Sequence, residues 1–304
     1  MRFYVSKCHD TLNGRPYNPE TITPYICLNP YYNTTLQKDT KVKYILDSGA
    51  FQDVGKEERL SFEDALNRQL NYEKKIGVKA SALVSYDHLV DEQVDERGQF
   101  KKRVDSDTGE QYVKETIDAA RYLVEKRKEL GSRKLILSCQ GTNKEQYLNC
   151  IESILEFAKP QDTIGFGGFC ILSKSKEYEK EYYEIVTEAF PKIHDAGIKK
   201  VHVFGMGVFR ALVQTDIYAR KNGIQCSYDT SSPEMNSVFG KSFNPLDAQM
   251  NAVFSKIHKG NGYYSADLAL MNVELITDYW KRLKTMPLPG SFTPGLISRG
   301  EKSN

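Results

Sequence analysis

Short apolar runs rich in β-branched and aromatic residues alternate along this chain with longer amphipathic stretches, and this alternation restricts the possible folds more than any other feature. Such a pattern is typical of parallel strands joined by helices. Strands are expected at Val42–Leu46, Ser81–Tyr86, Leu135–Cys139, Thr163–Phe166, Lys200–Phe204 and Ile224–Tyr228. Helices are expected at Ser61–Ile76, Gln111–Leu130, Lys144–Ala158, Lys176–Ala196, Val208–Lys221 and Ala266–Lys284.

The alternation permits either an open, doubly wound sheet or a closed eight-stranded barrel. Polar or glycine-containing clusters follow nearly every expected strand, and such groups can share one site only if the strands form a ring. We therefore predict an α/β fold, a TIM-type (β/α)8 barrel with insertions and without a zinc subdomain. The two remaining strands are expected at Pro24–Leu28 and in a weak segment after Phe239, and Met1–Val5 is expected to be an accessory strand.

The 304 residues are expected to form a single barrel domain, although the length alone would also allow two domains. Residues 1–40 would supply N-terminal strands and loops, residues 42–240 the motif-bearing barrel, and residues 241–304 a helical closure. No apolar run is long enough to span a bilayer and the first residues lack a signal pattern, so we expect a cytoplasmic protein without a membrane partner.

The charge and the cysteines exclude other classes. With 27% charged residues and 40% hydrophobic ones, the chain does not have the composition of a disordered protein. The six cysteines contain no CxxC pair, so reduced thiols are expected and a metal site is not. The net charge of +2 is low for a dedicated nucleic-acid binder.

Three aspartates, Asp47, Asp87 and Asp229, follow apolar strand runs. A carboxylate at such a position is costly unless it is paired or belongs to a polar site. Each could instead cap the following turn. Two carboxylates that face one centre suit glycosidic chemistry, in which one attacks the anomeric carbon and the other handles the proton of the leaving group.

Other residues at the strand ends would complete a pocket for a flat ligand. Gly167 and Gly168 let the backbone approach such a ligand closely, and Gln140 can read its edge. Phe51 and Phe204 could stack on its two faces, or they could be core residues. Together these residues indicate a purine-sized pocket.

Six segments in chain order resemble the tRNA-guanine transglycosylase superfamily. DSGAFQ at 47–52 is similar to the DSGG-[FY]-Q motif, and CSYDTSSPEMN at 226–236 is similar to the D-x-F-D-C-V-x-P-T-R-N stretch that carries the nucleophile. The others are VSYDH at 84–88, CQG at 139–141, GFGGF at 165–169 and VFGMG at 203–207. The resemblance spans residues 42–240, about two thirds of the chain.

The resemblance implies a covalent exchange of bases. Asp229 would be the nucleophile that attacks C1′ of the target nucleotide and releases guanine, and Asp47 would be the general acid/base that manages the N9 proton. No cofactor is implied. The implied substrate-binding residues are Ser48, Phe51, Asp87, Gln140, Gly167, Gly168, Phe204 and Gly205.

Two departures from the pattern concern the nucleic acid. The tRNA enzymes carry a C-x-C-x-x-C zinc cluster after the nucleophile, whereas no cysteine follows Cys226 here. Glu234 and Met235 replace the Thr-Arg of the family segment. The chain therefore looks more like the deoxypurine-in-DNA protein A branch, which exchanges guanine in DNA for 7-deazaguanines such as preQ0. That branch occurs in bacteria and phages, so the protein could be phage-encoded and act in the host cytoplasm.

A DNA substrate would need basic contacts beside the pocket. Lys101, Lys102 and Arg103 follow Asp87 in a long segment, and Lys241 follows the nucleophile loop. They could equally form a solvated face. A target base in a duplex must be flipped out to reach the pocket, or be met in single-stranded DNA, and a helicase or ATPase is a possible partner that opens the duplex.

Several alternatives remain open at this point. The chain could be a zinc-free tRNA-guanine transglycosylase. It could also be an N-glycosidase that acts on a guanine or 7-deazaguanine nucleoside, if water replaces the incoming base. A third possibility is a barrel without catalytic activity that binds a purine.

Overall fold

The computed structural model describes residues 1–37, 41–54, 56, 58–93, 100–170, 172, 175–244, 252–254 and 265–296. For residues 92, 93, 100, 101 and 252–254 it describes the backbone alone.

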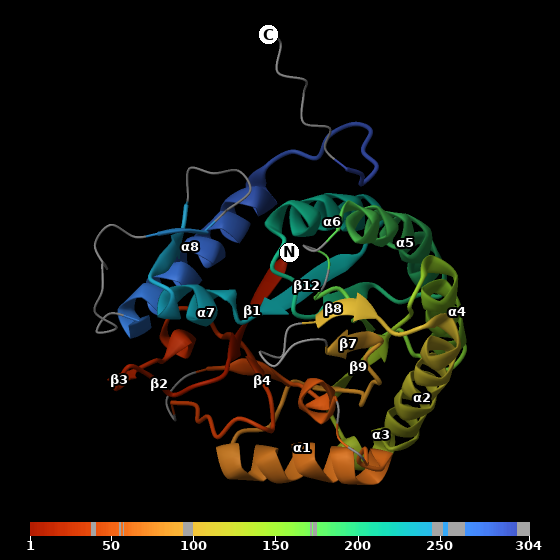
Figure 1. Ribbon diagram of the computed structural model, residues 1–304, viewed down its shortest axis with the longest axis horizontal. Helices are drawn as coiled ribbons and strands as arrows, with labels where there is room; N and C mark the ends of the chain where they lie inside the picture. Colours follow the sequence, from red (N-terminus) through yellow and green to blue (C-terminus); the bar gives the residue numbers. More distant parts are fainter. Residues whose placement is uncertain are drawn as a thin grey trace.

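Eight parallel strands close into a barrel, as the sequence predicts (Figure 1). Around the ring the strand order is β1-β12-β11-β10-β9-β6-β5-β4. The strands are β1 (Arg2–Lys7), β4 (Tyr25–Leu28), β5 (Lys43–Leu46), β6 (Ala82–Val84), β9 (Lys134–Cys139), β10 (Thr163–Phe166), β11 (Lys200–Val203) and β12 (Gln225–Thr230). The fold is thus an α/β TIM-type barrel.

The expectation for one barrel strand is wrong. The N-terminal segment is not accessory, because β1 lies in the ring and pairs with β12 on one side and β4 on the other. The segment after Phe239 instead forms β13 (Lys241–Phe243), which pairs antiparallel with β14 (Ala252–Phe254) outside the ring.

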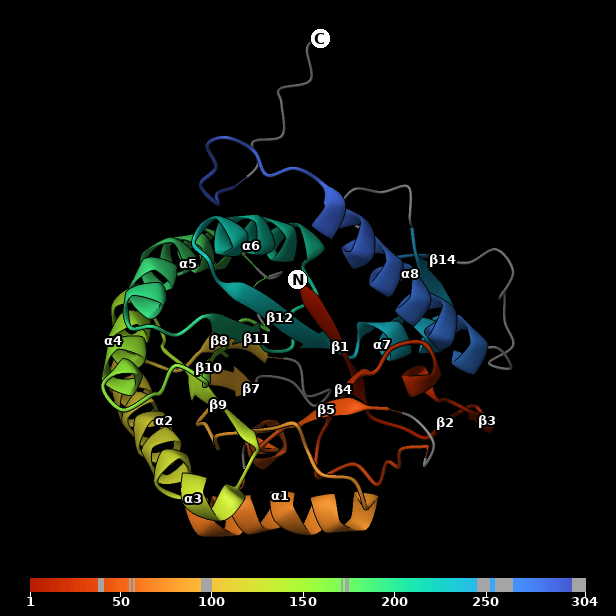
Figure 2. The ribbon, with the colours of Figure 1, turned by 180° about the vertical axis from the view of Figure 1, so that it is seen from behind.

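Helices surround the barrel, and Figures 1 and 2 show α1, α2, α4, α5 and α6 following one another around its outside. The helix α1 begins where Ser61 accepts a hydrogen bond from the Asp64 backbone at 3.1 Å, as its capping sequence predicts. The helices are α1 (Phe62–Ile76), α2 (Ser106–Glu125), α3 (Arg127–Leu130), α4 (Lys144–Leu155), α5 (Lys176–Asp195), α6 (Phe209–Lys221), α7 (Ser232–Val238) and α8 (Ser265–Thr285).

The remaining elements are short. In the described part of the chain, the connections between strands and helices contain two 3₁₀ turns and two further hairpins. They are η1 (Pro19–Thr21), η2 (Ala50–Asp53), the β2 (Thr11–Leu12) and β3 (Arg15–Pro16) pair, and the β7 (Asp91–Gln93) and β8 (Phe100–Arg103) pair. No helix in the described part of the chain is long and apolar enough to cross a membrane.

An apolar cluster fills part of the barrel interior. Side chains of successive barrel strands pack together inside the ring, because alternate residues of a strand face inward. These residues are Tyr4, Cys27, Ile45, Ala82, Val84 and Ile136. A second, larger core lies between the strands and the helices. The strands therefore form a rigid base that holds the polar residues after them.

Candidate active site

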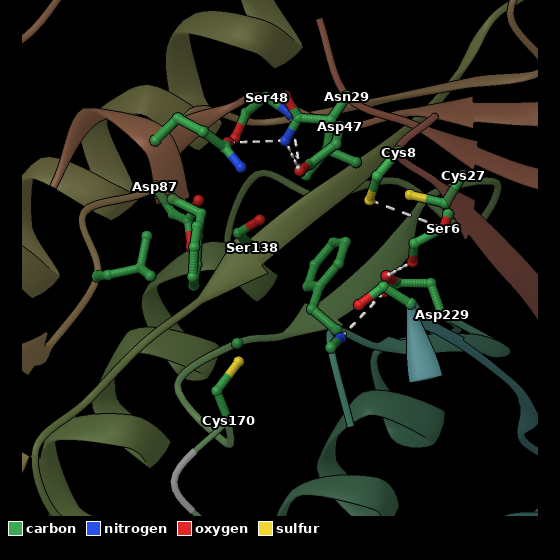
Figure 3. Close-up of a pocket in the computed structure, with 18 of the residues that line it drawn as sticks. Ser6, Cys8, Cys27, Asn29, Asp47, Ser48, Asp87, Ser138, Cys170 and Asp229 are labelled. Atoms are coloured by element: carbon green, nitrogen blue, oxygen red, sulfur yellow. Dashed lines mark hydrogen bonds between the residues drawn. The ribbon is translucent and has the colours of Figure 1, made fainter. Parts of the chain in front are cut away.

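The ten residues predicted as catalytic or substrate-binding all line one cavity of about 530 Å³. They lie where the barrel strands end or just beyond, which is where TIM barrels carry their active sites. Figure 3 shows Asp229 beside Ser6 on one side of the cavity and Asp87 on another, with Asp47 beside Asn29. The residues are Asp47, Ser48, Phe51, Asp87, Gln140, Gly167, Gly168, Phe204, Gly205 and Asp229.

Asp229 is buried in β12, and three groups contact its carboxylate. Ser6 Oγ donates to Oδ2 at 2.6 Å, and the Gly205 backbone N–H donates to Oδ1 with an N–O distance of 3.2 Å. His202 Nε2 also lies 3.2 Å from Oδ1. Because β12 lies between β1 and β11, these groups reach Asp229 from both neighbouring strands. A carboxylate held in this way has a fixed direction, as a nucleophile requires.

Asp47 is half-buried directly after β5, in a different electrostatic environment. Asn29 Nδ2 donates to its Oδ2 and the Ser48 backbone N–H donates to its Oδ1, both at 2.8 Å. Burial, together with the negative charges of Asp229 and Asp87, raises the pKa of Asp47 to about 7. Such a group can hold or release a proton near neutral pH, as a general acid/base must.

Two side chains of α1 hold the loop that carries Asp47. Arg68 donates to the Ser48 carbonyl and, at 3.0 Å, to Asp53 Oδ2. Gly49 adopts φ +79°, and a Cβ there would lie 2.8 Å from Arg68 Nη2, so the loop needs glycine at this point. Gln69 Nε2 contacts the carbonyls of Leu46, Asp47 and Val84 at 3.0–3.1 Å.

Asp53 is a strong anchor for the same loop. Burial acts to raise the pKa of Asp53, but hydrogen bonds from Lys56, Tyr31 and Tyr86 and the charge of Arg68 lower it to about 2. Asp53 therefore stays ionised and paired across the usual pH range.

Asp87 and Gln140 form a buried pair on the other side of the cavity. Gln140 Nε2 donates to Asp87 Oδ2, whereas Gln140 Oε1 is buried without a hydrogen-bond partner. Burial raises the pKa of Asp87, against the opposing effect of the hydrogen bond from Gln140. Since buried acceptors are normally satisfied, an unpartnered one in a cavity wall suits a donor on a ligand.

Glycine at 167 and 168 makes room for Gln140. A Cβ at Gly167 would lie 2.2 Å from Gln140 Nε2, and one at Gly168 would lie 2.7 Å from Gln140 Oε1. Gly168 also adopts φ +74°, which L side chains rarely adopt. The Gly-Gly pair therefore lets the amide lie directly over the backbone that follows β10.

The two predicted stacking rings lie in different surroundings. Phe51 lies in η2 and is 43% exposed, which is not the environment of a core residue. Phe204 is half-buried after β11, and its ring meets that of His202 edge-on at 4.7 Å. Both rings line the cavity, and their stacking on a base stays a prediction.

Several residues of the site were not predicted. Ser6, Asn29 and His202 each contact one of the two catalytic candidates. Ser6 and Asn29 are the polar residues at the ends of β1 and β4, so the rule applied to the other strands would have found them. His202 lies inside a strand, and only the barrel geometry shows that it faces Asp229. Cys8, Cys27 and Cys170 also line the cavity.

The four basic residues predicted to contact phosphate lie in different surroundings. The Arg103 side chain is only 6% exposed, and Nη1 donates to Glu181 at 2.5 Å and to the Thr142 carbonyl at 2.7 Å. This arrangement counts against a phosphate contact at Arg103, because Nη1 is paired and the side chain is shielded from solvent. Lys102 is exposed in β8, Lys241 is half-buried in β13, and the side chain of Lys101 lies outside the described residues.

Within the described residues, no group of three or more His, Cys, Asp or Glu side chains is placed to hold a metal ion. No protein-family model matches the chain, and a search of curated proteins found no match.

Proposed function

We propose that this protein is a DNA-guanine transglycosylase that exchanges guanine for a 7-deazaguanine base of the preQ0 type. One observation carries the proposal: two differently held carboxylates, Asp47 and Asp229, share a cavity with the buried Asp87–Gln140 pair. The cavity of about 530 Å³ has room for a nucleotide.

In the proposed reaction, Asp229 attacks C1′ of the target nucleotide. The bond from C1′ to the carboxylate oxygen forms, the bond from C1′ to N9 breaks, and its electron pair goes to the departing guanine. Asp47 delivers the proton to that base, which suits a carboxyl group with a pKa of about 7. The incoming base then attacks C1′, regenerates the Asp229 carboxylate and loses its proton to Asp47. Two displacements of this kind give ping-pong kinetics.

The proposed base recognition uses the pair on the far side of the cavity. Guanine and its 7-deaza analogues present N–H donors and a carbonyl acceptor along one edge. Gln140 Oε1 has no partner in the protein and could accept from such a donor. Asp87 and Gly168 lie next to Gln140, so a base placed beside this pair would meet carboxylate and amide acceptors.

The preference for DNA rests on the departures in the nucleophile segment. Where the tRNA enzymes have Arg after Thr, this chain has Met235, which is 51% exposed. Glu234 is buried, accepts a hydrogen bond from the Cys8 backbone at 3.2 Å and also contacts His9. Glu234 thus helps to hold the segment after β1. Met235 does not supply the positive charge that Arg has in the tRNA enzymes.

The test is an exchange assay with isotopically labelled preQ0 and four acceptors: duplex DNA, single-stranded DNA, tRNA and free guanine nucleosides. Nucleoside mass spectrometry should find the label in DNA, together with one released guanine for each base inserted. Label in single-stranded DNA alone would support the need for a partner that opens the duplex. Label in tRNA alone would refute the DNA assignment, and guanine release without insertion would identify an N-glycosidase.

A further inference from the structure

We propose that His202 is a positioning residue that selects which oxygen of Asp229 attacks C1′. The inference rests on the proposed function, since it concerns the same nucleophile. His202 is 1% exposed and is not among the residues that line the cavity, so it acts through Asp229 and not on the substrate.

The register of two barrel strands creates the contact. His202 on β11 is the cross-strand partner of Ser227 on β12, and Asp229 lies two residues further along β12. Because the side-chain period of a strand is two, Ser227 and Asp229 face the same side. The imidazole spans both: its Nδ1 lies 2.9 Å from Ser227 Oγ and its Nε2 lies 3.2 Å from Asp229 Oδ1.

The proton on Nε2 follows from the partners of the ring. Asp229 in its ionised form only accepts hydrogen bonds, so Nε2 must carry the proton that joins them. In the neutral ring, Nδ1 then accepts from the Ser227 hydroxyl. In the cationic ring, Nδ1 donates to Ser227 Oγ, and the hydroxyl can turn to the Val201 carbonyl at 3.3 Å. Both charge states of His202 therefore keep the donor to Asp229.

The two oxygens of the Asp229 carboxylate therefore accept from different numbers of donors. Oδ1 accepts from two donors, His202 Nε2 and the Gly205 backbone, whereas Oδ2 accepts from Ser6 alone. A carboxylate oxygen has two favourable acceptor positions, so Oδ2 keeps one of them for a new bond. In the proposed intermediate, C1′ is bonded to Oδ2 and Oδ1 is the ester carbonyl, still held by its two donors.

The first experiment is independent of any activity. In wild-type protein labelled with ¹³C and ¹⁵N, the ring signals of His202 are assigned by through-bond correlation to its own backbone, which needs no variant. We expect the proton on Nε2, in either the neutral or the cationic ring. A proton on Nδ1 alone would overturn the proposal, because Nε2 would then have nothing to donate to Asp229. This result stands whether or not the protein exchanges bases.

The second experiment compares two substitutions with different reach. His202→Gln places an amide N–H near the former Nε2, whereas His202→Asn reaches only as far as Nδ1. In single-turnover reactions with guanine-containing DNA, His202→Asn should slow formation of the covalent adduct by about 10- to 100-fold, with KM little changed, because the nucleophile is misaligned. His202→Gln should recover most of the rate.

Melting temperatures of both variants show whether the fold is kept. Wild-type rates in both variants would refute the positioning role. So would an equal loss of rate in both variants, if both melt at the temperature of the wild type. If neither variant folds, the ring tautomer decides. If the wild type forms no adduct on any acceptor, the proposed function fails, while the tautomer still reports on the contact itself.

Discussion

Two walls of the cavity differ in how completely their polar atoms are satisfied. In the nucleophile wall, formed by Ser6, Gly205 and Asp229, both carboxylate oxygens have partners within the protein, one of which is His202 outside the lining. In the reading wall, formed by Asp87, Gln140, Gly167 and Gly168, a buried amide oxygen has none. Under the proposed function, the first wall is preorganised for one bond-forming atom, whereas a bound base would complete the second.

The largest expected effect is at the nucleophile wall. Asp229→Asn keeps the size of the side chain but removes the nucleophile, so base exchange should fall by about 10⁴-fold or more. The measurement is the initial rate of preQ0 insertion into DNA. Asp118→Asn, an exposed carboxylate on α2, is the matched control and should behave like the wild type. An Asp229→Asn rate within tenfold of the wild type would refute the covalent mechanism.

Asp47→Asn should reduce exchange by about 10²- to 10⁴-fold, the usual contribution of a general acid/base. The pKa of Asp47 is raised to about 7, so the proton needed by the departing base is present below that pH and lost above it. The wild-type rate of adduct formation should therefore decline above about pH 7, and the variant should lack this decline. A decline that persists in the variant would assign it to another group.

Asp47→Asn should lower activity but raise the stability of the folded protein. The pKa of Asp47 rises from 3.8 to about 7 on folding, so the folded protein binds the proton more tightly and loses stability as pH rises between these values. Relative to the wild type, Asp47→Asn should gain about 3–4 kcal/mol between pH 4 and pH 8. Urea unfolding at both pH values measures this, and a constant difference would contradict it.

A smaller effect is expected at the reading wall. In Gly167→Ala, the new Cβ would lie 2.2 Å from Gln140 Nε2 and must displace it from Asp87. Loss of this hydrogen bond to a charged group should raise KM for the incoming base by about 10- to 100-fold. Gly290→Ala is the control, because no atom lies within 4 Å of its added Cβ. An unchanged KM would show that the Gln140 contact does not contribute to base binding.

The smallest effect is expected outside both walls. If Lys102 contacts a phosphate, Lys102→Ala should weaken DNA binding by about two- to fivefold and reduce the salt dependence by about one counterion. Lys134, exposed at the start of β9 and hence at the other end of the barrel, is the control. Equal salt dependence in the two variants would remove Lys102 from the DNA interface.

The sequence predicts the fold and the lining of the cavity because both depend on local patterns. An apolar run followed by a polar cluster identifies Asp47, Asp87, Gln140 and Asp229 one strand at a time. The same signal is present in RFYVSK and YICLN, which end in Ser6–Lys7 and Asn29. The signal was not applied at Ser6, because Met1–Val5 was expected to be an accessory strand and not one of the eight barrel strands whose ends meet at the site.

What local patterns cannot predict is the partner of each group. His202 is a polar residue flanked by valines, and only the register of β11 against β12 brings its ring to Asp229. At Arg103 the local pattern predicted exposure that the structure does not show. A run of basic residues predicts a solvated surface, but Arg103 forms a salt bridge with Glu181. Contacts of this kind depend on tertiary packing, which charge patterning does not describe.

The hydrogen bond from Ser6 to Asp229 joins residues 223 positions apart, across the seam where β1 meets β12. A chain that has formed its helices and most of its strands still lacks this contact, because closing so long a loop is a slow, late event in folding. The contact from Ser6 therefore forms only when the ring closes, whereas His202 and Gly205 can reach Asp229 as soon as β11 pairs with β12. A partly folded form with an open ring would thus hold this carboxylate at Oδ1 alone.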